Sequence, residues 1–292
     1  MNEKLIIMSI FIGFALLEFI SGRFLNRDKS KKKDAIIEII STTAILVFTV
    51  PGIIWATNWI GQTFFPELKN TWSDLGWPMM LLMFIFFDDM VQYWWHRTCH
   101  KPLLYGLHRA HHSANYMSVR VVYRNNLFFY MIMPNLWITG FLIYFGLFEV
   151  YPYYLIAKML VIFGAHSSLP WDRVLHSKPW LSPIGWLVER TISTPSTHHA
   201  HHGMHIEDGV TNYKGNYGNM LFIWDVIFGT AHITRKYPDA YGIENLEESS
   251  WQQELFWPLV STTSNSMDDV ADASMDESLG LNLDEQNVSK AE

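Results

Sequence analysis

Long apolar runs separated by short polar segments make up most of this 292-residue chain. The first run, residues 5–22, contains a single acidic residue, Glu18, in about 18 positions, which is close to the length that an α-helix needs to cross a bilayer. Similar runs cover residues 35–60, where a Pro-Gly pair interrupts the pattern, and residues 77–95. This pattern predicts an all-α integral membrane protein.

The first run has an alternative interpretation, which is a cleaved signal peptide. Only Lys4 gives it a positive flank on its N-terminal side, and no small-residue cleavage site precedes the basic segment at residues 23–33. We therefore predict that the run stays in the protein as a membrane span. The basic segment then marks the cytoplasmic side, because Lys and Arg are enriched in cytoplasmic loops.

Two further runs, residues 127–148 and 153–163, are joined by the tight connection EVYPY. Together they can cross the bilayer and return, or they can form a re-entrant hairpin, because the second run is short for a span. Both paths predict a helical bundle of about four spans. The third run ends next to His96 on the cytoplasmic side, so we expect a cytoplasmic helical cap there.

The composition agrees with this class, because 49% of the residues are hydrophobic and only 17% are charged, as expected when much of the surface meets lipid. The net charge of −7 equals that of residues 261–292, which contain eight acidic residues and one Lys. That segment has no aromatic residue, so we predict a membrane-embedded domain at residues 1–260 and a disordered acidic tail at residues 261–292. No basic patch indicates nucleic acid as a partner.

Histidine occurs in three short clusters at helical spacing. His96 and His100 are four residues apart, which on a helix places both rings on one face. The other two clusters share the pattern H-x-x-H-H, and a chain with 13 histidines in 292 residues would contain roughly 0.03 such matches by chance. These two clusters consist of His108, His111 and His112, and of His198, His201 and His202.

Eight clustered imidazoles indicate a metal site. Neutral imidazole is a nitrogen donor that suits iron, zinc, copper and nickel better than magnesium or calcium. One ion takes about four to six ligands, so these rings predict two ions that share a pocket. The single cysteine, Cys99, excludes a Cys-rich zinc module, an iron–sulfur cluster and an internal disulfide.

The clusters and their surroundings resemble the fatty acid hydroxylase and sterol desaturase superfamily of integral membrane di-metal oxygenases. The resemblance covers residues 88–230 and includes Asp89, the sequence YWWHR around His96, TP before the third cluster, and NYGN with WDVIFGT behind it. It implies two iron ions, which zinc can replace on purification, that activate dioxygen to hydroxylate or desaturate a sterol, a fatty acyl chain or an ether lipid. Because no flavin or haem motif is present, it also implies that a separate reductase or electron-transfer protein supplies electrons.

The resemblance further implies which residues form the site. His166 stands where the family has an additional ligand. Asp89 is an acidic residue near the end of an apolar run, where an ionisable group usually has a partner, and we expect it to act in catalysis by hydrogen-bonding a ligand histidine. The implied metal ligands are His96, His100, His108, His111, His112, His166, His198, His201 and His202. We expect no ligand role for His176, His199, His205 and His232.

Two other classes of protein remain open alternatives, a His-rich membrane metal transporter and a structural zinc-binding membrane protein. A transporter would place its ligands near the middle of the spans, whereas these clusters follow the ends of predicted spans. A structural zinc site normally uses thiolates. The sequence therefore favours the oxygenase.

Overall fold

The computed structural model of the chain describes residues 3–25 and 31–260, so the predicted acidic tail at 261–292 lies outside the described residues. The part that it describes is helical, and its only β-bridges are two isolated ones, between Ile192 and Leu221 and between Gly203 and Tyr241. The prediction of an all-α fold is therefore confirmed. The helices are α1 (Glu3–Ile20), α2 (Lys32–Thr43), α3 (Val50–Phe64), α4 (Trp77–Phe84), α5 (Val91–Cys99), α6 (Pro102–His112), α7 (Leu127–Met131), α8 (Pro134–Tyr144), α9 (Tyr151–His166), α10 (Ser182–Thr191), α11 (Pro195–His201), α12 (Ile223–Phe228) and α13 (Trp251–Phe256).

The Pro-Gly pair in the second apolar run does not break the helix. A π-helical segment, Ala44–Thr49, joins α2 to α3 directly, and the N–H of Val50 donates to the carbonyl of Ile45, five residues back. Pro51 lacks an N–H and would clash with the carbonyl four residues before it in a regular α-helix, so one wider turn accommodates the ring. A second π segment, Ile85–Met90, joins α4 to α5 in the same way.

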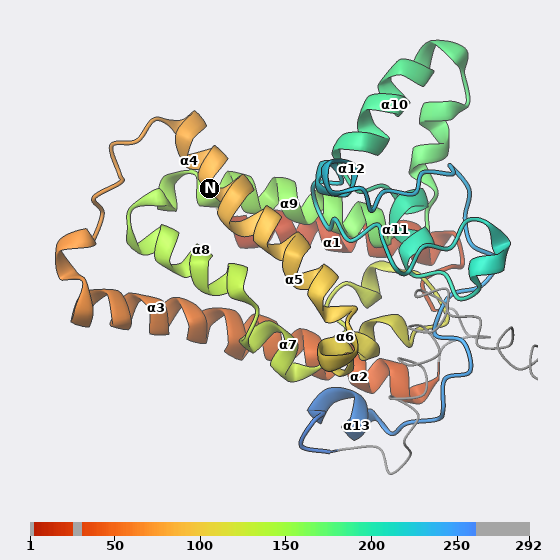
Figure 1. Cartoon of the computed structure of the whole chain (residues 1–292), viewed down its shortest axis with the longest axis horizontal. Coiled ribbons are helices and arrows are strands. Elements are labelled where there is room, and N and C mark those ends of the chain that lie inside the picture. The colour runs from red at the N-terminus through yellow and green to blue at the C-terminus, as the bar shows by residue number, and fades with distance from the viewer. Residues whose placement is uncertain (1–2, 26–30, 261–292) are drawn as a thin grey trace, which may run out of the picture.

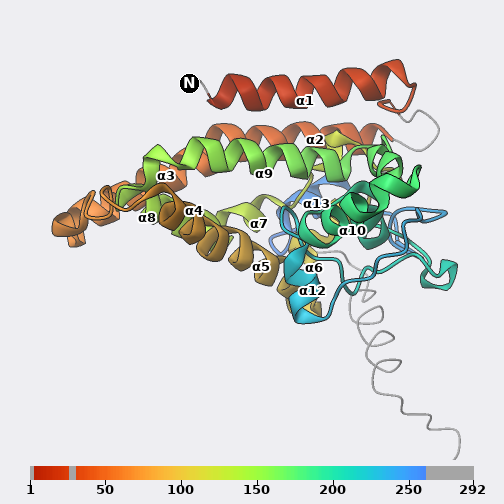
Figure 2. The ribbon, with the colours of Figure 1, turned by 90° about the horizontal axis from the view of Figure 1, so that it is seen from above.

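Two of the resulting helices, Lys32–Phe64 and Leu127–Tyr144, are long and apolar enough to cross a membrane. They lie in a bundle whose long helices run in broadly similar directions, with α3 beside α8 and α1 beside α9 (Figures 1 and 2). The short helices α6, α10, α11 and α12 gather at one end of the bundle (Figure 2). The expected count of about four spans remains a prediction.

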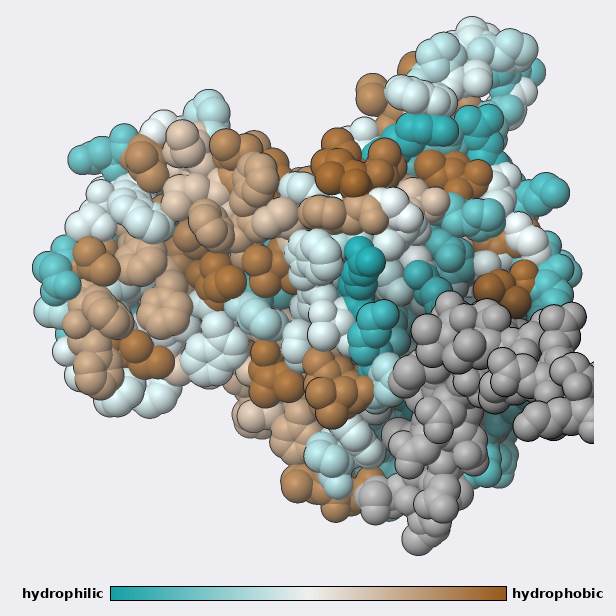
Figure 3. Space-filling model, viewed as in Figure 1, coloured by the Kyte–Doolittle hydropathy of each residue, from teal (hydrophilic) through white to brown (hydrophobic). Residues whose placement is uncertain are grey.

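Large apolar side chains cover much of the bundle surface. Phe48, Trp55 and Trp59 of the second apolar run are each more than half exposed. Brown hydrophobic residues spread over the end of the bundle formed by α3, α4 and α8, and hydrophilic residues gather around the short helices (Figure 3). A soluble monomer rarely exposes apolar patches of this extent, so this surface is suited to lipid.

The one acidic residue of the first apolar run is fully buried and is hydrogen-bonded to segments 100 to 150 residues further along the chain. The carboxylate of Glu18 accepts hydrogen bonds from Ser118 Oγ at 2.6 Å, from Ser167 Oγ at 3.0 Å and from the backbone N–H of Ser168 at 2.9 Å. A buried carboxylate is costly unless it is hydrogen-bonded. Glu18 therefore fixes the end of α1 against the segments that follow α6 and α9.

A second buried carboxylate, Asp88, links three helices of the bundle. It forms an ion pair with Lys158 of α9 and accepts hydrogen bonds from Tyr154 at 2.7 Å and from Asn135 of α8 at 2.7 Å. An intramembrane charge normally needs such partners. This network positions the helix that carries His96 relative to α8 and α9.

Two arginines that follow the second histidine cluster bind carboxylates of α2. Arg124, fully buried, pairs with Asp34 at 2.7 Å and also donates to the carbonyl of Ala110 at 2.6 Å. Arg120 pairs with Glu38 at 2.9 Å. These pairs connect α2 to the end of α6, where the second cluster lies.

Replacing Arg124 by Ala should destabilise the whole chain strongly. It leaves Asp34 as an uncompensated buried charge, and breaking a buried pair from one side costs about 3–5 kcal/mol. Thermal unfolding of the detergent-purified protein measures this as a large drop in Tm. The matched control is Lys31→Ala, which removes the exposed pair of Lys31 with Glu248 and should leave Tm nearly unchanged. Equal Tm values for wild type and Arg124→Ala would contradict the role assigned to this pair.

Candidate metal centre

Four separate helix ends bring the clustered histidines together. The first cluster lies at the C-terminal end of α5, the second in the last turns of α6, and the third in and just after α11. His166 is the last residue of α9. Pro102 and Pro195 begin α6 and α11, where proline is favoured because the first turn leaves N–H groups without a partner. Thr194 caps α11 in a capping box with Thr197.

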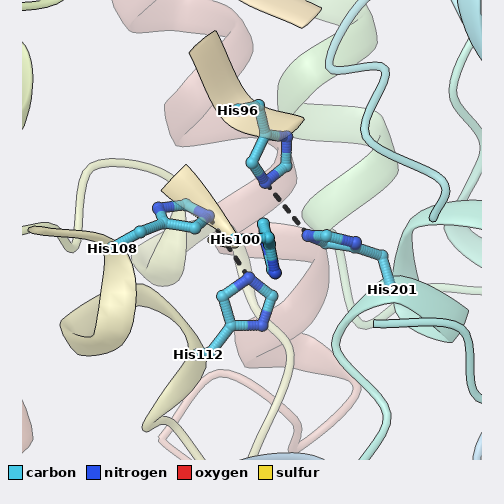
Figure 4. Close-up of side chains that lie close together, drawn as sticks. All are labelled: His96, His100, His108, His112 and His201. Atoms are coloured by element: carbon cyan, nitrogen blue, oxygen red, sulfur yellow. Dashed lines mark hydrogen bonds between the residues drawn. The ribbon is translucent and has the colours of Figure 1, made fainter. Parts of the chain in front are cut away.

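All nine predicted histidines fall into two groups of converging rings. In each group the ligand atoms lie within 4.8 Å of one another. The first group contains five rings, which point toward one another in Figure 4. Its shortest contacts join Nε2 of His96 to Nε2 of His201 at 3.0 Å, and Nε2 of His108 to Nε2 of His112 at 3.2 Å. The members of the first group are His96, His100, His108, His112 and His201.

The second group lies beside the first and is buried throughout. Nε2 of His166 lies 2.9 Å from Nε2 of His198 and 3.4 Å from Nε2 of His111. The rings of His112 and His202 stack across the two groups, with centroids 4.4 Å apart. The members of the second group are His111, His166, His198 and His202.

The two H-x-x-H-H clusters divide between the groups in opposite ways. In the second cluster the outer pair, His108 and His112, belongs to the first group and His111 to the second. In the third cluster the outer pair belongs to the second group, and His201 crosses to the first. The four-residue spacing keeps each outer pair on one helix face. The inner histidine faces the neighbouring group, so every cluster of this pattern serves both.

Hydrogen bonds from the Nδ1 atoms to backbone carbonyls orient many of these rings. Nδ1 of His96 donates to the carbonyl of Tyr217 at 2.6 Å, and Nδ1 of His201 donates to that of Gly215 at 2.7 Å. His166 and His111 bind the carbonyls of Ile162 and Arg124 in the same way. A carbonyl oxygen only accepts, so the proton of each neutral ring lies on Nδ1. Each Nε2 then presents a lone pair to the centre of its group.

This arrangement has a direct electrostatic consequence. Nε2 of His96 and Nε2 of His201 face each other at 3.0 Å with two lone pairs, and His111 faces His166 in the same way at 3.4 Å. Such a contact is repulsive unless a cation lies between the nitrogens. Burial first, and neighbouring imidazoles second, hold the pKa values of His111 and His201 well below their ordinary range, so a proton does not fill this role at neutral pH.

A transition-metal ion meets the same need. Two nitrogens at right angles around a metal, each about 2.1 Å from it, are about 3.0 Å apart, which matches the shortest contacts of both groups. Nε2 atoms of His100 and His202 and Nδ1 of His198 are buried and have no hydrogen-bond partner in the described residues. Buried polar atoms without a partner are rare in native structures. The donor set therefore fits two adjacent metal ions held by imidazole nitrogen.

The expectation that Asp89 accepts a hydrogen bond from a ligand histidine was wrong. Asp89 instead accepts from Nε1 of Trp224 at 2.8 Å and from the backbone N–H of Leu221 at 3.3 Å. Its carboxylate faces α12, and the indole of Trp224 in that helix is its side-chain donor. Asp89 therefore holds α12 against the helix that carries His96, and backbone carbonyls perform the orienting role that we had expected of it.

The segment that provides two of those carbonyls is itself fixed by side chains. Asn216 lies between Gly215 and Tyr217 with a positive φ of 54°, a conformation that Asn tolerates better than most residues. Asp225 accepts from the N–H groups of Tyr217 at 2.8 Å and Gly218 at 2.7 Å. Burial raises the pKa of Asp225 to about 6. The sequence signature NYGN with WDVIFGT thus positions His96 and His201 through their Nδ1 atoms.

Sequence reasoning missed Asn125, whose side-chain oxygen lies 2.8 Å from Nδ1 of His108. No spacing rule marks this residue, because it follows the second cluster at a distance of 17 residues from His108. The four remaining histidines lie outside both groups, and one of them, His205, lies in a third, more exposed group of possible ligands with Glu207 and Glu244. His199 binds Tyr241 and the carbonyl of Ser167, His176 lies near Glu189, His205 near Glu244, and His232 near the carbonyl of Gly209.

Comparison with known proteins decides the family. Residues 81–230, which contain both groups, match the sequence profile of the family described as fatty acid hydroxylase. The chain belongs to the fatty acid hydroxylase family. The resemblance to this family that the histidine clusters suggested is therefore confirmed for residues 81–230.

Several curated relatives extend the comparison beyond that segment. The chain is 27% identical over 227 residues to an alkylglycerol monooxygenase of Danio rerio, which covers 75% of this chain and 46% of the relative. It is 28% identical to the alkylglycerol monooxygenase of Caenorhabditis elegans over 79% of this chain and 42% of the relative. It is 26% identical to the lathosterol oxidase of Rattus norvegicus over 70% of this chain and 66% of the relative. The chain thus spans about half the length of the alkylglycerol monooxygenases it matches, and no solved structure matches it.

Replacing Asn125 by Leu should weaken metal binding by about 10–100-fold, because partners that orient a ligand histidine contribute to affinity on this scale. Asn125→Asp keeps an oxygen acceptor for Nδ1 of His108 and should retain most of the affinity. Metal retained after dialysis against a graded chelator series measures both variants. Asn58→Leu, which removes an exposed amide contact with Gln62, is the control and should behave as wild type. Equal retention in Asn125→Leu and wild type would show that this contact does not orient a ligand.

Proposed function

We propose that this protein is a membrane-bound di-iron oxidoreductase that uses dioxygen to hydroxylate or desaturate a C–H bond of a lipid. The observation that carries the proposal is the pair of adjoining groups, in which nine imidazoles converge, eight of them buried, and lone pairs face one another. Family membership and the relatives named alkylglycerol monooxygenase and lathosterol oxidase support a lipid substrate, with an ether lipid or a sterol favoured.

In this proposal the nine histidines hold both ions, five around one and four around the other. Bound iron would supply the activation of dioxygen that an unreactive C–H bond requires. The chain's own contribution is orientation and exclusion of water. The carbonyls of Tyr217, Gly215, Ile162 and Arg124 hold the Nδ1 protons, so the rings cannot rotate or change tautomer. Burial of the rings keeps them unprotonated and ready to bind.

The proposed topology has about four spans, with the histidine groups in a cap on the cytoplasmic side. The grouping of α6, α10, α11 and α12 at one end of the bundle supports it (Figure 2). Helix α10 supports it as well, because it projects at a steep angle to the long helices in Figure 1 and exposes Ile184, Trp186 and Leu187 along its length. Such an arrangement suits a helix that lies in the membrane interface. The basic segment at residues 23–33 follows the first apolar run in the sequence, which favours the cytoplasmic side for the end of that run.

A partner must supply electrons. With Cys99 as its single cysteine, the chain cannot hold an iron–sulfur cluster, and it has no recognisable flavin or haem motif. We therefore propose a separate reductase or electron-transfer protein as partner. The two alternatives fit less well. A metal transporter would have its ligands along a path through the bundle, whereas both groups lie at helix ends. A structural zinc site normally uses thiolates, and neither group contains one.

Two adjacent residues provide a sharp test of the two-ion arrangement. His112 belongs to the first group and His111 to the second. Each of His112→Ala and His111→Ala should lower the iron content by at least half and remove turnover, because each variant leaves a different ion with an incomplete ligand set. Elemental analysis of the purified variants measures this. His176→Ala is the control and should keep its iron and activity, since His176 lies outside both groups. Full iron content in both variants would contradict the assignment of one iron ion to each group.

The substrate and the reaction type can be tested together. Total lipid extracts from cells with and without the gene should differ in one lipid class when compared by mass spectrometry. A gain of ~16 mass units indicates hydroxylation and a loss of ~2 indicates desaturation, because these are the changes that one oxygen atom or one lost pair of hydrogens makes in C–H oxidation. The comparison needs oxygen and a competent reductase. No change in any lipid under those conditions would count against the enzyme.

A further inference from the structure

A cavity of about 250 Å³ lies behind the second histidine group and is not part of it. Its walls come from the segment that follows α1, the segment that follows α9, helix α11 and the C-terminal loop. The residues on which the argument depends are Arg23, Ser168, Arg173, His199, Tyr237 and Tyr241. The cavity is too small for a sterol or a long acyl chain, since pockets for drug-sized ligands measure about 300–1,000 Å³. It can hold a head group.

The polar groups of the aromatic walls are already engaged. Nε2 of His199 donates to the carbonyl of Ser167, so its Nδ1 accepts from the hydroxyl of Tyr241 at 2.9 Å. The hydroxyl of Tyr237 donates to Asp172. The donors left for a ligand are therefore the hydroxyl of Ser168, which has no hydrogen-bond partner in the described residues, and the guanidinium groups of the two arginines.

Both guanidinium groups line the cavity, and no carboxylate of its lining neutralises their positive charge. Arg23 donates one N–H to the carbonyl of Ser168 at 2.7 Å, which fixes the side chain but does not neutralise it. Arg173 lies over the ring of Tyr237, with its Cζ 4.6 Å from the ring centroid. No carboxylate is among the residues that line the cavity. Asp172, the neighbouring acid, is occupied by Tyr237 and by the N–H of Ser196 at 2.9 Å.

Two arginines without a lining carboxylate define an anion site, and the fork of N–H groups on guanidinium matches phosphate oxygens best. The position of Arg23 suggests where the phosphate comes from. It follows the apolar helix α1 by three residues, at the depth where a span would leave the hydrocarbon and meet lipid phosphates. A free phosphate ion would satisfy the same arginines, so the two sources have to be separated by experiment.

The cavity shares its wall with the metal centre. His199 is the next residue after His198 of the second group, and its ring binds the carbonyl of Ser167, the residue after His166. An occupant of the cavity would therefore lie against the outer side of the two segments whose inner sides carry His166 and His198.

We propose that this cavity is a phosphate-binding site that holds the head group of a phospholipid beside the second histidine group, with Arg23 and Arg173 as its ligands. The site itself stands on the geometry of the cavity. Only the lipid source of the phosphate rests on the proposed membrane orientation, and neither part depends on the oxygen chemistry.

The test uses the purified full-length protein in detergent and isothermal titration calorimetry with three probes. Dihexanoyl phosphatidate carries the phosphate and a short lipid body, dihexanoylglycerol carries the body alone, and inorganic phosphate carries the anion alone. Wild type should bind the phosphatidate, should not bind the glycerolipid, and should bind inorganic phosphate at least 10-fold more weakly. Because the measurement is of binding, it stays informative whether or not the protein turns over a lipid.

Variants then locate the site. Arg23→Gln and Arg173→Gln should each weaken phosphatidate binding at least 10-fold, and Arg173→Lys should recover part of it because the charge returns without the fork. Lys178→Gln removes an exposed cation that does not line the cavity and should bind as wild type. Iron content and Tm equal to wild type show that a variant is folded.

Three outcomes would overturn the proposal. Absence of phosphatidate binding to wild type excludes the site. Unchanged binding in folded Arg23→Gln and Arg173→Gln places the anion elsewhere. Inorganic phosphate that binds as tightly as the phosphatidate excludes the lipid source and leaves a site for a free phosphoanion.

Discussion

Nine imidazoles held close together, eight of them buried, bring nitrogen lone pairs into repulsive contacts that a cation would relieve. Hydrogen bonds from Nδ1 to backbone carbonyls turn the lone pairs of His96 and His201 toward each other at 3.0 Å. Burial and mutual repulsion disfavour protonation, so a bound metal ion is the cation that would relieve the repulsion between the lone pairs. The arrangement of the rings therefore favours the binding of two positive ions. The rest of the fold holds the rings in this arrangement.

The support consists of charged and polar side chains placed inside an otherwise apolar bundle. Glu18 secures α1 to the segments after α6 and α9, and Asp88 secures the helix of the first cluster to α8 and α9. Arg124 joins the end of α6 to the start of α2. Each of these groups would be costly in an apolar interior without its partners, so each fixes one arrangement of the helices. Together they bring four helix ends, far apart in sequence, to one place.

Much of the site could be predicted from the sequence, because it is built from local helical spacing. The spacing of His96 and His100, and the repeated H-x-x-H-H pattern, identified eight of the nine converging rings, and the family resemblance added His166. The all-helical fold followed from the apolar runs. These features depend on neighbours within one or two turns, which a sequence displays directly.

Most of the features that sequence reasoning missed depend on contacts between separate segments, and one depends on a local change in helix geometry. The division of each H-x-x-H-H cluster between two groups is set by how α6 and α11 approach each other. Asp89 looked like a partner for a histidine, but the indole of Trp224, 135 residues away, occupies its carboxylate. Asn125 has no pattern to mark it, and the Pro-Gly pair at 51–52 looked like an interruption until the π segment Ala44–Thr49 showed how the helix continues.

X-ray absorption at the iron edge of the purified wild-type protein, reconstituted with ferrous iron, tests the central claim most directly. The account predicts two irons per chain and a first shell dominated by nitrogen at roughly 2.1 Å, with the outer-shell scattering of imidazole rings and no sulfur. One iron per chain, or a shell in which imidazole is a minor component, would contradict the conclusion that the two groups of histidines hold two metal ions.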